Sequence, residues 1–573
     1  MNRPLARLLA GLLALGVLGA GGCASVPSES QVTPLKKISE GQGPALPPGP
    51  GDETNPLDLV RGFVNASGSS ENRHAAARRF LTADAQNWDD NASLTVLAEQ
   101  FDTVYAHPPG ENRAVVRLRG QQLGRITANG SFAPAEAPVE LDVAVSREDG
   151  QWRIDGPPSG TVVRLGDVRS NYKKVRLYFV DPIRHSPVAD LRHLALSPAR
   201  SLPARVVEQL LGGPSDALSG AAVSAIPRAV RLRSNVATSP DGTLIVDLTE
   251  LGNLDEGQRW LLAAQIVLSV AEVNVSRVRL LDDGAPLLAK EPVLSRETFA
   301  DLENADDPRP DIPGLVVVAG KARPLMGTEL GAPLGAAPGV AGLDLAGAIM
   351  SPDGQQVAVV NRQGGRSLLV GKLGGPLGGT GVQGVALSRP SWSPTGGELW
   401  CVRNTDTVVR LTFDGAKHPM RAPLDASSLT ALGPITDLRL SRDGLRVAAI
   451  ASGRLVVGAL ARSTDGGAVV RNVRMLHAGQ LTNLITVDWR AADQLAVAGR
   501  AAQNAVAMVS VDGLDLSPVP TNNLTPPLTS IASSPGRPLL VTDQNGLWSF
   551  GADDLGTWRQ LSPGAGVIAG YPG

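Results

Sequence analysis

The sequence predicts a multidomain protein in which two α+β domains are followed by an all-β propeller of about five to six blades. Three observations indicate this class. Up to about residue 165 helical periodicity gives way to strand periodicity, and over 172–290 strand and helical patterns alternate. From about Pro313 onward a strand-rich repeat takes over. The length of 573 residues suggests three to four domains of roughly 150 residues each.

Composition sets bounds on the class of protein. A hydrophobic fraction of 43% is typical of folded globular chains. The formal net charge is −2 and the basic residues are scattered, so nothing indicates nucleic-acid binding. No apolar run after Cys23 approaches the roughly 20 residues that span a bilayer, so the body of the protein is expected outside the membrane.

Residues 1–22 have the organisation of a secretory signal peptide. Two arginines precede "LLAGLLALGVLGAGG", an apolar run too short for a bilayer-spanning helix. Small residues then lead directly into a cysteine, so the predicted cleavage falls between Gly22 and Cys23. A single bridge between Cys23 and the distant Cys401 would be a poor disulfide framework, which favours separate roles for the two thiols.

The junction "GAGGCASVPSES" resembles a lipobox, the cleavage and lipidation signal of bacterial lipoproteins. The resemblance implies that Cys23 becomes the first mature residue and carries a diacylglyceryl thioether, usually with an additional N-acyl chain such as palmitate. Ala20 departs from the leucine that is more common at its place. A plain secretory signal with an incidental cysteine is the alternative.

A tether is predicted over 23–54. Its stretch "GQGPALPPGPGDET" is rich in Pro and Gly and lacks apolar periodicity, and Pro-rich chains extend by roughly 3 Å per residue. The tether is therefore expected to hold the first domain several nanometres from the bilayer.

The first α+β domain is predicted over 55–165. The stretch "NPLDLVRGFVNAS" places Val60 and Phe63 on one helical face, and "ENRHAAARRFLTADAQNW" repeats the pattern with Phe80, so two helices are expected. Alternation in "RAVVRLRGQQLGRIT" and "VELDVAVSREDGQWRIDGPP" then predicts antiparallel strands, with a hairpin turn at Asp149-Gly150.

A second α+β domain is predicted over 172–290, with the element order β-α-β-β-α-β. Val175, Leu177 and Phe179 share one strand face, and "DEGQRWLLAAQIVLSVAEV" is expected to be the longest helix. This order, together with "LLGGPSDAL", "AIPRAVRL", "VDLT" and "VRLLDDGAPL", resembles the GerMN domain first seen in spore germination proteins.

After a linker at 291–312, a propeller is predicted over 313–573. The stretches "IMSPDGQQVAVV", "SWSPTGGELWCV", "RLSRDGLRVAAI", "VDWRAADQLAVA" and "IASSPGRPLLVT" recur at intervals of about 42 to 49 residues, a period typical of propeller blades. Five blades can be identified from these repeats. The flanks "GLVVVAGKARPLMG" and "GVIAGYPG" could complete a sixth by pairing the two ends of the domain.

Sequence motifs for catalysis or metal binding are missing. There is no G-x-S-x-G elbow, and "GGRSLLVGKLGG" fails as a phosphate loop because Leu373 stands where a hydroxyl would bind magnesium. No HExxH or other paired ligand spacing occurs, so no metal, cofactor or catalytic residue is predicted, and ligand-binding residues stay unassigned. The six histidines are His74, His107, His185, His193, His418 and His477.

Other reactive side chains are explained more simply by packing or solvation. Asp282-Asp283 and Asp553-Asp554 could be imagined as glycosidase carboxylates, but adjacent acidic residues in loops are usually solvated. Cys401 lies in the predicted strand "ELWCVRN" and is expected to be buried and inert. Tryptophans of the propeller are expected to pack between sheets, although they could instead line a ligand channel; they are Trp392, Trp400, Trp489, Trp548 and Trp558.

The stretches "CASVPSES", "PPGPGDETNPLDLVRGFVNAS" and "ARRFLT", the GerMN-like segment and the final "YPG" together resemble the LpqB family of actinobacterial lipoproteins. The resemblance implies an accessory lipoprotein on the outer face of the cytoplasmic membrane. It also implies an interaction with the extracellular domain of an MtrB-like sensor histidine kinase of the MtrAB two-component system, with a link to cell-wall metabolism and division. The resemblance assigns no catalytic residue.

Two other functions remain open at this point. The propeller channel could bind or hydrolyse a cell-envelope glycan or peptidoglycan fragment, and clustered carboxylates with aromatic walls would favour that function. A plain polar rim would favour partner binding instead. The chain could also be a structural spacer with no signalling partner.

Overall fold

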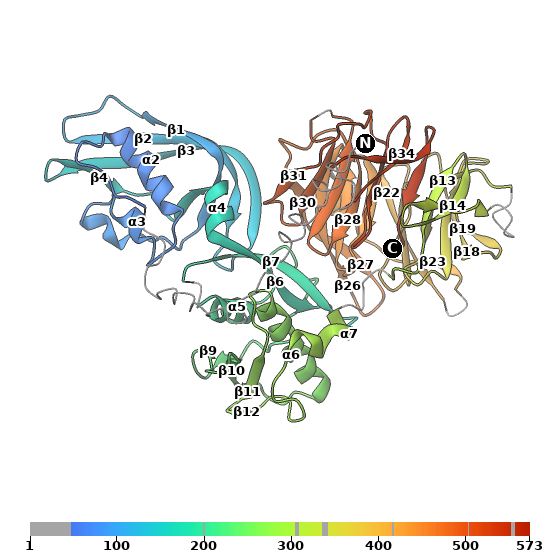
Figure 1. The fold of residues 1–573 in the computed structure, drawn as a ribbon, viewed down its shortest axis with the longest axis horizontal. Coiled ribbons are helices and arrows are strands. Elements are labelled where there is room, and N and C mark those ends of the chain that lie inside the picture. The colour runs from blue at the N-terminus through green and yellow to red at the C-terminus, as the bar shows by residue number, and fades with distance from the viewer. Residues whose placement is uncertain are drawn as a thin grey trace, which may run out of the picture. The chain divides into compact units, whose positions relative to one another are not determined.

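The computed structural model describes residues 47–573, apart from 199–200, 304–308, 335–341, 415–416, 502 and 552–555. Gly22, Cys23 and the first part of the predicted tether lie outside the described residues. Among the described helices, none is long and apolar enough to cross a membrane. Figure 1 labels the elements along the chain.

The N-terminal domain is built on a five-stranded sheet in the order β4-β3-β2-β1-β5. Helix α2 (Pro56–Ser67) begins after Asn55, whose side chain accepts a hydrogen bond from Asp58 N at 3.0 Å, and buries the predicted Val60 and Phe63. The Asp149-Gly150 turn is confirmed, since both residues have positive φ, as a two-residue hairpin turn requires. The remaining elements are β1 (Leu94–Tyr105), β2 (Arg113–Ile126), β3 (Phe132–Glu148), β4 (Gln151–Gly156), β5 (Thr161–Arg164) and α4 (Leu165–Asn171).

The second predicted helix is wrong over most of its length. Helical structure is confined to α3 (Ala75–Arg78) and the short 3-10 helix η1 (Asp84–Asn87). Between them the chain runs beside β4, because Ile154 N donates to Phe80 O and Thr82 N donates to Ile154 O, both at 2.9 Å. Phe80 is buried as the pattern requires, but in a turn after α3 instead of within a longer helix.

The second domain contains a sheet in the order β12-β11-β10-β8, with β9 also paired to β10. The longest helix, α6 (Glu256–Ala271), is the predicted one, and it begins at a capping box in which Asp255 and Gln258 accept hydrogen bonds from each other's backbone N–H groups. The other elements are α5 (Leu202–Leu211), β8 (Arg231–Leu232), β9 (Ala237–Thr238), β10 (Leu244–Thr249), β11 (Val278–Asp282), β12 (Ala285–Pro286), η3 (Arg296–Phe299) and α7 (Ala300–Glu303).

One strand of this domain, β7 (Pro187–Ala195), was not predicted. It pairs with β6 (Tyr172–Val180) in an antiparallel hairpin, so the domain begins with two strands before its first helix. The ionisable side chains of Asp190, Arg192 and His193 break the apolar pattern, yet all three are buried. Each has an ionic partner, which is what burial of a charged group requires.

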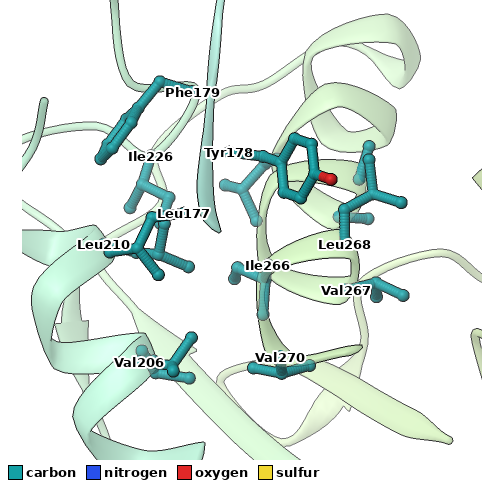
Figure 2. Close-up of a cluster of buried hydrophobic side chains, with 14 of the residues drawn as sticks. Leu177, Tyr178, Phe179, Val206, Leu210, Ile226, Ile266, Val267, Leu268 and Val270 are labelled. Atoms are coloured by element: carbon teal, nitrogen blue, oxygen red, sulfur yellow. The ribbon is translucent and has the colours of Figure 1, made fainter. Parts of the chain in front are cut away.

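Apolar side chains from β6, α5 and α6 form the core of this domain. Val175, Leu177 and Phe179 of β6 are fully buried, which confirms the predicted strand face. Figure 2 shows the cluster in which these elements meet, with Leu177, Tyr178, Phe179, Val206, Leu210, Ile226, Ile266, Val267, Leu268 and Val270. The β6–β7 hairpin is therefore held by the helices, although it is separate from the larger sheet.

The C-terminal region is a propeller of six four-stranded sheets within the described residues, coloured from yellow-green to red in Figure 1. Five of the sheets are continuous in sequence. Their strands are β16 (Leu345–Met350), β17 (Gln356–Asn361), β18 (Arg366–Lys372) and β19 (Leu377–Gly384); β20 (Ser391–Trp392), β21 (Glu398–Arg403), β22 (Thr407–Phe413) and β23 (Pro419–Arg421); β24 (Ile435–Leu440), β25 (Arg446–Ala451), β26 (Arg454–Arg462) and β27 (Ala468–Leu476); β28 (Leu484–Ala491), β29 (Gln494–Gly499), β30 (Val506–Ser510) and β31 (Leu516–Pro518); β32 (Ser530–Ala532), β33 (Leu539–Thr542), β34 (Gly546–Phe550) and β35 (Arg559–Pro563). Helix α8 (Ser427–Thr430) precedes β24.

The sixth sheet is built from both ends of the propeller, as predicted. It has the order β15-β14-β13-β36, from β13 (Gly314–Val318), β14 (Lys321–Met326), β15 (Glu329–Leu330) and β36 (Ile568–Gly570). The closing pair is antiparallel, with Val316 opposite Ala569. Because this sheet joins the first and last strands, the ring closes without an unpaired inner edge.

Candidate functional site at the two mouths of the propeller

The histidines do not gather into a site. His74, His193 and His477 are buried, and His107, His185 and His418 are exposed. Burial lowers the pKa of both His74 and His477 below the usual histidine value. Within the described ranges, no three His, Cys, Asp or Glu side chains are close enough to hold a metal ion.

The acidic pair Asp282-Asp283 lies at a turn, where both carboxylates have protein partners. Asp282 lies 3.2 Å from the Arg259 guanidinium, and Asp283 accepts a hydrogen bond from the Thr249 hydroxyl at 2.8 Å. Asp283 has a φ of 50° at the connection between β11 and β12. The other pair, Asp553 and Asp554, lies outside the described residues.

The packing interpretations of Cys401 and most of the tryptophans agree with the structure. Cys401 is 1% exposed, and burial raises the pKa of its thiol to about 12, so it is a poor nucleophile at neutral pH. Trp400 and Trp558 are buried with their indole N–H groups bound to Glu398 Oε2 at 2.9 Å and Pro520 O at 2.7 Å.

One mouth of the propeller contains a cavity of about 200 Å³ with aromatic walls. The cavity lies where the innermost strands end, and all six sheets contribute to it. One lining residue from each sheet is Pro352, Trp392, Leu440, Trp489, Ser533 and Tyr571. Trp392 and Trp489 therefore pack between sheets and also line a cavity, so the two interpretations of these tryptophans are not exclusive.

The opposite mouth has a cavity of about 210 Å³, lined where the same strands begin. Its lining has no aromatic residue and mixes hydroxyl, charged and aliphatic side chains, and the sheets contribute Gly347, Ser388, Thr436, Thr486, Ser530 and Ile568. The propeller thus presents one mouth with aromatic residues and one without them, instead of a single type of rim.

Arg389 blocks the channel between the two mouths. Its guanidinium donates hydrogen bonds to Ile531 O at 2.8 Å, Ala569 O at 3.1 Å and Val487 O at 3.2 Å. It also donates to Asp437 Oδ2 at 3.3 Å. These acceptors belong to four different innermost strands, so one buried side chain fastens the centre of the ring.

A second arginine, Arg439, lies beside this plug and lines the aromatic mouth. Its guanidinium donates to Pro390 O, and its Nε lies 3.8 Å from Asp488 Oδ1. Asp488 also lies 3.6 Å from Arg389. Burial, reinforced by the positive charge of Arg389, lowers the pKa of Arg439 to about 10, which still leaves it charged at neutral pH.

Glu398 is a buried carboxylate that accepts hydrogen bonds from two arginines and a tryptophan. Arg410 Nη2 donates to its Oε1 at 2.7 Å, Arg462 Nη2 donates to its Oε2 at 3.0 Å, and Trp400 Nε1 also donates to Oε2. Burial opposes the charge, but the two guanidiniums outweigh burial and lower the pKa of Glu398 to about 2. A carboxylate held this way is a structural anion and a poor proton donor or acceptor at neutral pH.

A buried hydrogen bond joins β7 to the propeller. His193 Nε2 lies 2.7 Å from Asp512 Oδ2, and both side chains are about 5% exposed. Burial alone would raise the pKa of Asp512, but hydrogen bonds from His193 and from Ser510 outweigh it, so the pKa lies well below the usual value. The pair holds two parts of the chain together and is enclosed away from either mouth.

Sequence reasoning missed the arginines of the channel. Arg389 and Arg439 both precede or lie in predicted inner strands, in "LSRPSW" and "LRLSRD". An arginine within an otherwise apolar strand was a usable signal, because a buried guanidinium must find several acceptors. Because basic residues are scattered along the whole sequence, these two arginines did not stand out.

Three family models match successive parts of the chain. A family model for the LpqB N-terminal domain matches residues 49–169, one for sporulation and spore germination matches 176–288, and one for the LpqB beta-propeller domain matches 330–569. Lipoprotein LpqB of Mycolicibacterium smegmatis is 31% identical over 98% of this chain and 98% of its own length. The chain belongs to the LpqB lipoprotein family.

Other members of the LpqB family show similar relationships. Lipoprotein LpqB of Nocardia farcinica is 32% identical over 97% of this chain and 96% of its own. Lipoprotein LpqB of Mycobacterium tuberculosis is 31% identical over 98% of both. Among solved structures, the Cps50 (Swd1) beta-propeller domain of Myceliophteria thermophila is 14% identical over 37% of this chain and 67% of that chain, with a TM-score of 0.27, a likeness too weak to bear on function.

Proposed function

We propose that the chain is a lipid-anchored protein of the cell envelope that regulates a sensor histidine kinase by binding its extracellular domain. The observation that carries the proposal is family membership along the whole chain, since relatives named lipoprotein LpqB match 98% of it. The expected kinase is MtrB-like, within an MtrAB-like system linked to cell-wall metabolism and division.

The anchor in this proposal is the lipid on Cys23, after cleavage following Gly22. One acyl chain binds a membrane only marginally, whereas two or more bind stably, so the diacylglyceryl group gives lasting attachment. Attachment on the outer face of the cytoplasmic membrane confines the protein to the surface where the kinase domain is exposed. This raises the effective concentration of one partner near the other without any new contact.

Action by binding, without catalysis, is supported by the state of the acidic and thiol groups in the propeller. Asp437 and Asp488 face the Arg389 plug, Glu398 is held by two guanidiniums, and Cys401 is buried. A glycosidase needs two carboxyl groups on opposite sides of a substrate. Asp437, Asp488 and Glu398 instead neutralise arginines, which argues against their use as the acid and base of a hydrolase.

The proposed domain division has a Pro/Gly-rich tether at 23–54, the two α+β domains at 55–165 and 172–290, a linker at 291–312 and the propeller at 313–573. The first and second α+β domains and the propeller each offer a surface to the kinase. Deleting each in turn would identify the one that binds.

The direct test is a pulldown of the full-length lipidated protein with the extracellular domain of the kinase. Association that survives salt, and altered kinase output in a deletion strain, are the expected results. Absence of association together with unchanged kinase signalling would leave the spacer function as the better explanation.

A further inference from the structure

The contact between the second domain and the propeller is polar at its centre. Strand β7 and the turn before it meet two turns of the propeller, at 441–446 and 510–515. Hydrogen bonds that cross the contact join His193 Nε2 to Asp512 Oδ2 at 2.7 Å, Arg184 Nη1 to Asp443 O at 3.1 Å, and Arg446 to Ala189 O. Water can replace each of these bonds when the two sides separate, so the net free energy that each contributes is small.

The rim of the contact carries exposed charges. Asp515 of the propeller lies 3.3 Å from Arg169 of α4 and 3.5 Å from Lys174 of β6, and the three side chains are 31 to 47% exposed. Exposed ion pairs add little to stability and are weakened by salt. The rim therefore orients the two sides more than it holds them together.

Apolar side chains cross the contact at separate points. Leu191 of β7 packs within a cluster of the propeller, and Leu514 packs within a cluster of the N-terminal domain. Leu445 and Ala459 of the propeller pack against the core of the second domain. Contacts that combine scattered apolar side chains with polar pairs are typical of domains that move relative to one another as folded units.

Asp512 belongs to a type of turn that the propeller also uses at an exposed position. In the turns "SVDG" at 510–513 and "STDG" at 463–466, the serine hydroxyl and the backbone N–H after the glycine both donate to Oδ1 of the aspartate. Asp465 is exposed, whereas Asp512 is 4% exposed and its Oδ2 bonds to His193. One oxygen of Asp512 thus forms the turn, and the other serves the contact.

The chain that joins the two sides is anchored separately on each of them. Glu303 accepts a hydrogen bond from the Tyr178 hydroxyl of the second domain at 3.2 Å. The carbonyl groups of Arg309 and Ile312 accept hydrogen bonds from Arg537 of the propeller at 2.8 and 2.7 Å. Separation of the contact therefore breaks neither anchor.

We propose that this contact is a releasable latch, so that the propeller separates from the two α+β domains while both sides stay folded. The hydrogen bond between His193 and Asp512 is the centre of the latch, and release exposes β7 together with the 510–515 turn. A partner that binds the newly exposed surfaces would favour the released state. The latch does not depend on which partner this is, so it stands apart from kinase regulation.

The latch is tested by following a thiol placed inside the contact. The variant Ala459→Cys puts a thiol at a position that is 1% exposed and packs against the second domain. The native thiol of Cys401 is equally buried within the propeller, so its reaction reports unfolding of the propeller itself. In the full-length protein in detergent, iodoacetamide is expected to label the introduced thiol about tenfold or more faster than Cys401.

Asp512→Asn in the Ala459→Cys background weakens the centre of the latch. Because a buried charged group loses its partner, labelling of the introduced thiol should become about tenfold or more faster, while labelling of Cys401 stays unchanged. Asp465→Asn is the matched control, since it makes the same change in the same type of turn at an exposed position. It should leave both rates unchanged.

Carbodiimide crosslinking tests the docked state without an introduced cysteine. The reagent activates a carboxylate, a lysine amine in contact with it forms an amide bond, and the activated oxygen leaves as part of a urea. Lys174 Nζ lies 3.5 Å from Asp515 Oδ2 across the contact, and Lys290 Nζ lies 3.5 Å from Glu256 Oε1 within the second domain. Mass spectrometry should find both crosslinks in the wild type, and Asp512→Asn should reduce only the first.

Three results would overturn the proposal. Equal labelling rates of the introduced thiol and Cys401 would show that the contact opens only when the propeller unfolds. Equal effects of Asp512→Asn and Asp465→Asn would remove His193 and Asp512 from the latch. A wild-type crosslink within the second domain without the one across the contact would show that the sides are not docked. None of these measurements involves the kinase, so failure here is separate from failure of the regulatory proposal.

Discussion

Replacing Glu398 by Gln tests whether the buried charge network holds adjacent blades together. Glu398 lies in β21, and its guanidinium partners lie in β22 of the same sheet and in β26 of the next, at 2.7 and 3.0 Å. Glutamine keeps the size of the side chain but removes the negative charge. Two largely buried guanidiniums then lose the anion that balances them.

The magnitude follows from the pKa of Glu398, which folding lowers from 4.5 to about 2. Each tenfold change in the acid constant corresponds to about 1.4 kcal/mol, so the charged form contributes about 3 kcal/mol at neutral pH. This agrees with the roughly 3–5 kcal/mol lost when one partner of a buried ion pair is removed. For a domain of this size, the melting temperature should fall by about 6–12 °C.

The assay is differential scanning calorimetry of wild type and Glu398→Gln as a function of pH. Because the folded pKa lies below the unfolded one, the stabilisation is complete above about pH 5 and is lost as the pH falls towards 2. The gap between the two proteins should therefore narrow over that range. Glu329→Gln, an exposed position on β15, is the control and should melt like wild type. Equal melting at pH 7, or a gap that stays constant down to about pH 2, would refute the electrostatic argument.

Three further predictions concern residues elsewhere. The Asp512→Asn variant should destabilise the contact between β7 and the propeller by about 3 kcal/mol, because His193 loses its buried partner. Limited proteolysis of this variant should be faster than that of wild type, and an equal rate of cleavage would contradict the prediction. The Cys401 thiol should resist alkylation at pH 8 in the folded protein and react on unfolding, a contrast that iodoacetamide labelling and mass spectrometry can measure. The Cys23→Ala variant should be lost from the membrane fraction or keep its signal peptide. Normal processing and retention of this variant in the membrane fraction would refute lipidation as the anchor.

The sequence predicted the repeating parts of this fold because period and turn chemistry are local properties. The blade interval, the Asp149-Gly150 turn and the closure of the ring by β13 and β36 all depend on patterns that a few residues carry. Strand β7 escaped because Asp190 and His193 look solvent-exposed in sequence. Their burial depends on partners distant in the chain, and no local pattern reports such partners.

The same limit applies to the candidate site. Sequence analysis could flag Trp392 and Trp489 as either core or channel residues, but their shared cavity appears only when the ends of six strands converge. The second helix failed for a related reason. Amphipathic spacing placed Phe80 in the core correctly, whereas hydrogen bonds to Ile154 in β4 determined the backbone conformation.

The closing strand β36 has a practical consequence for how the protein is handled. Residues 571–573 continue from β36 directly into the lining of the aromatic cavity. Any affinity tag or fluorescent fusion joined directly to Gly573 would therefore begin at this mouth and could cover it. Pulldown measurements with the kinase domain call for a tag inserted in an exposed loop of another domain, so that both mouths of the propeller stay open to a partner.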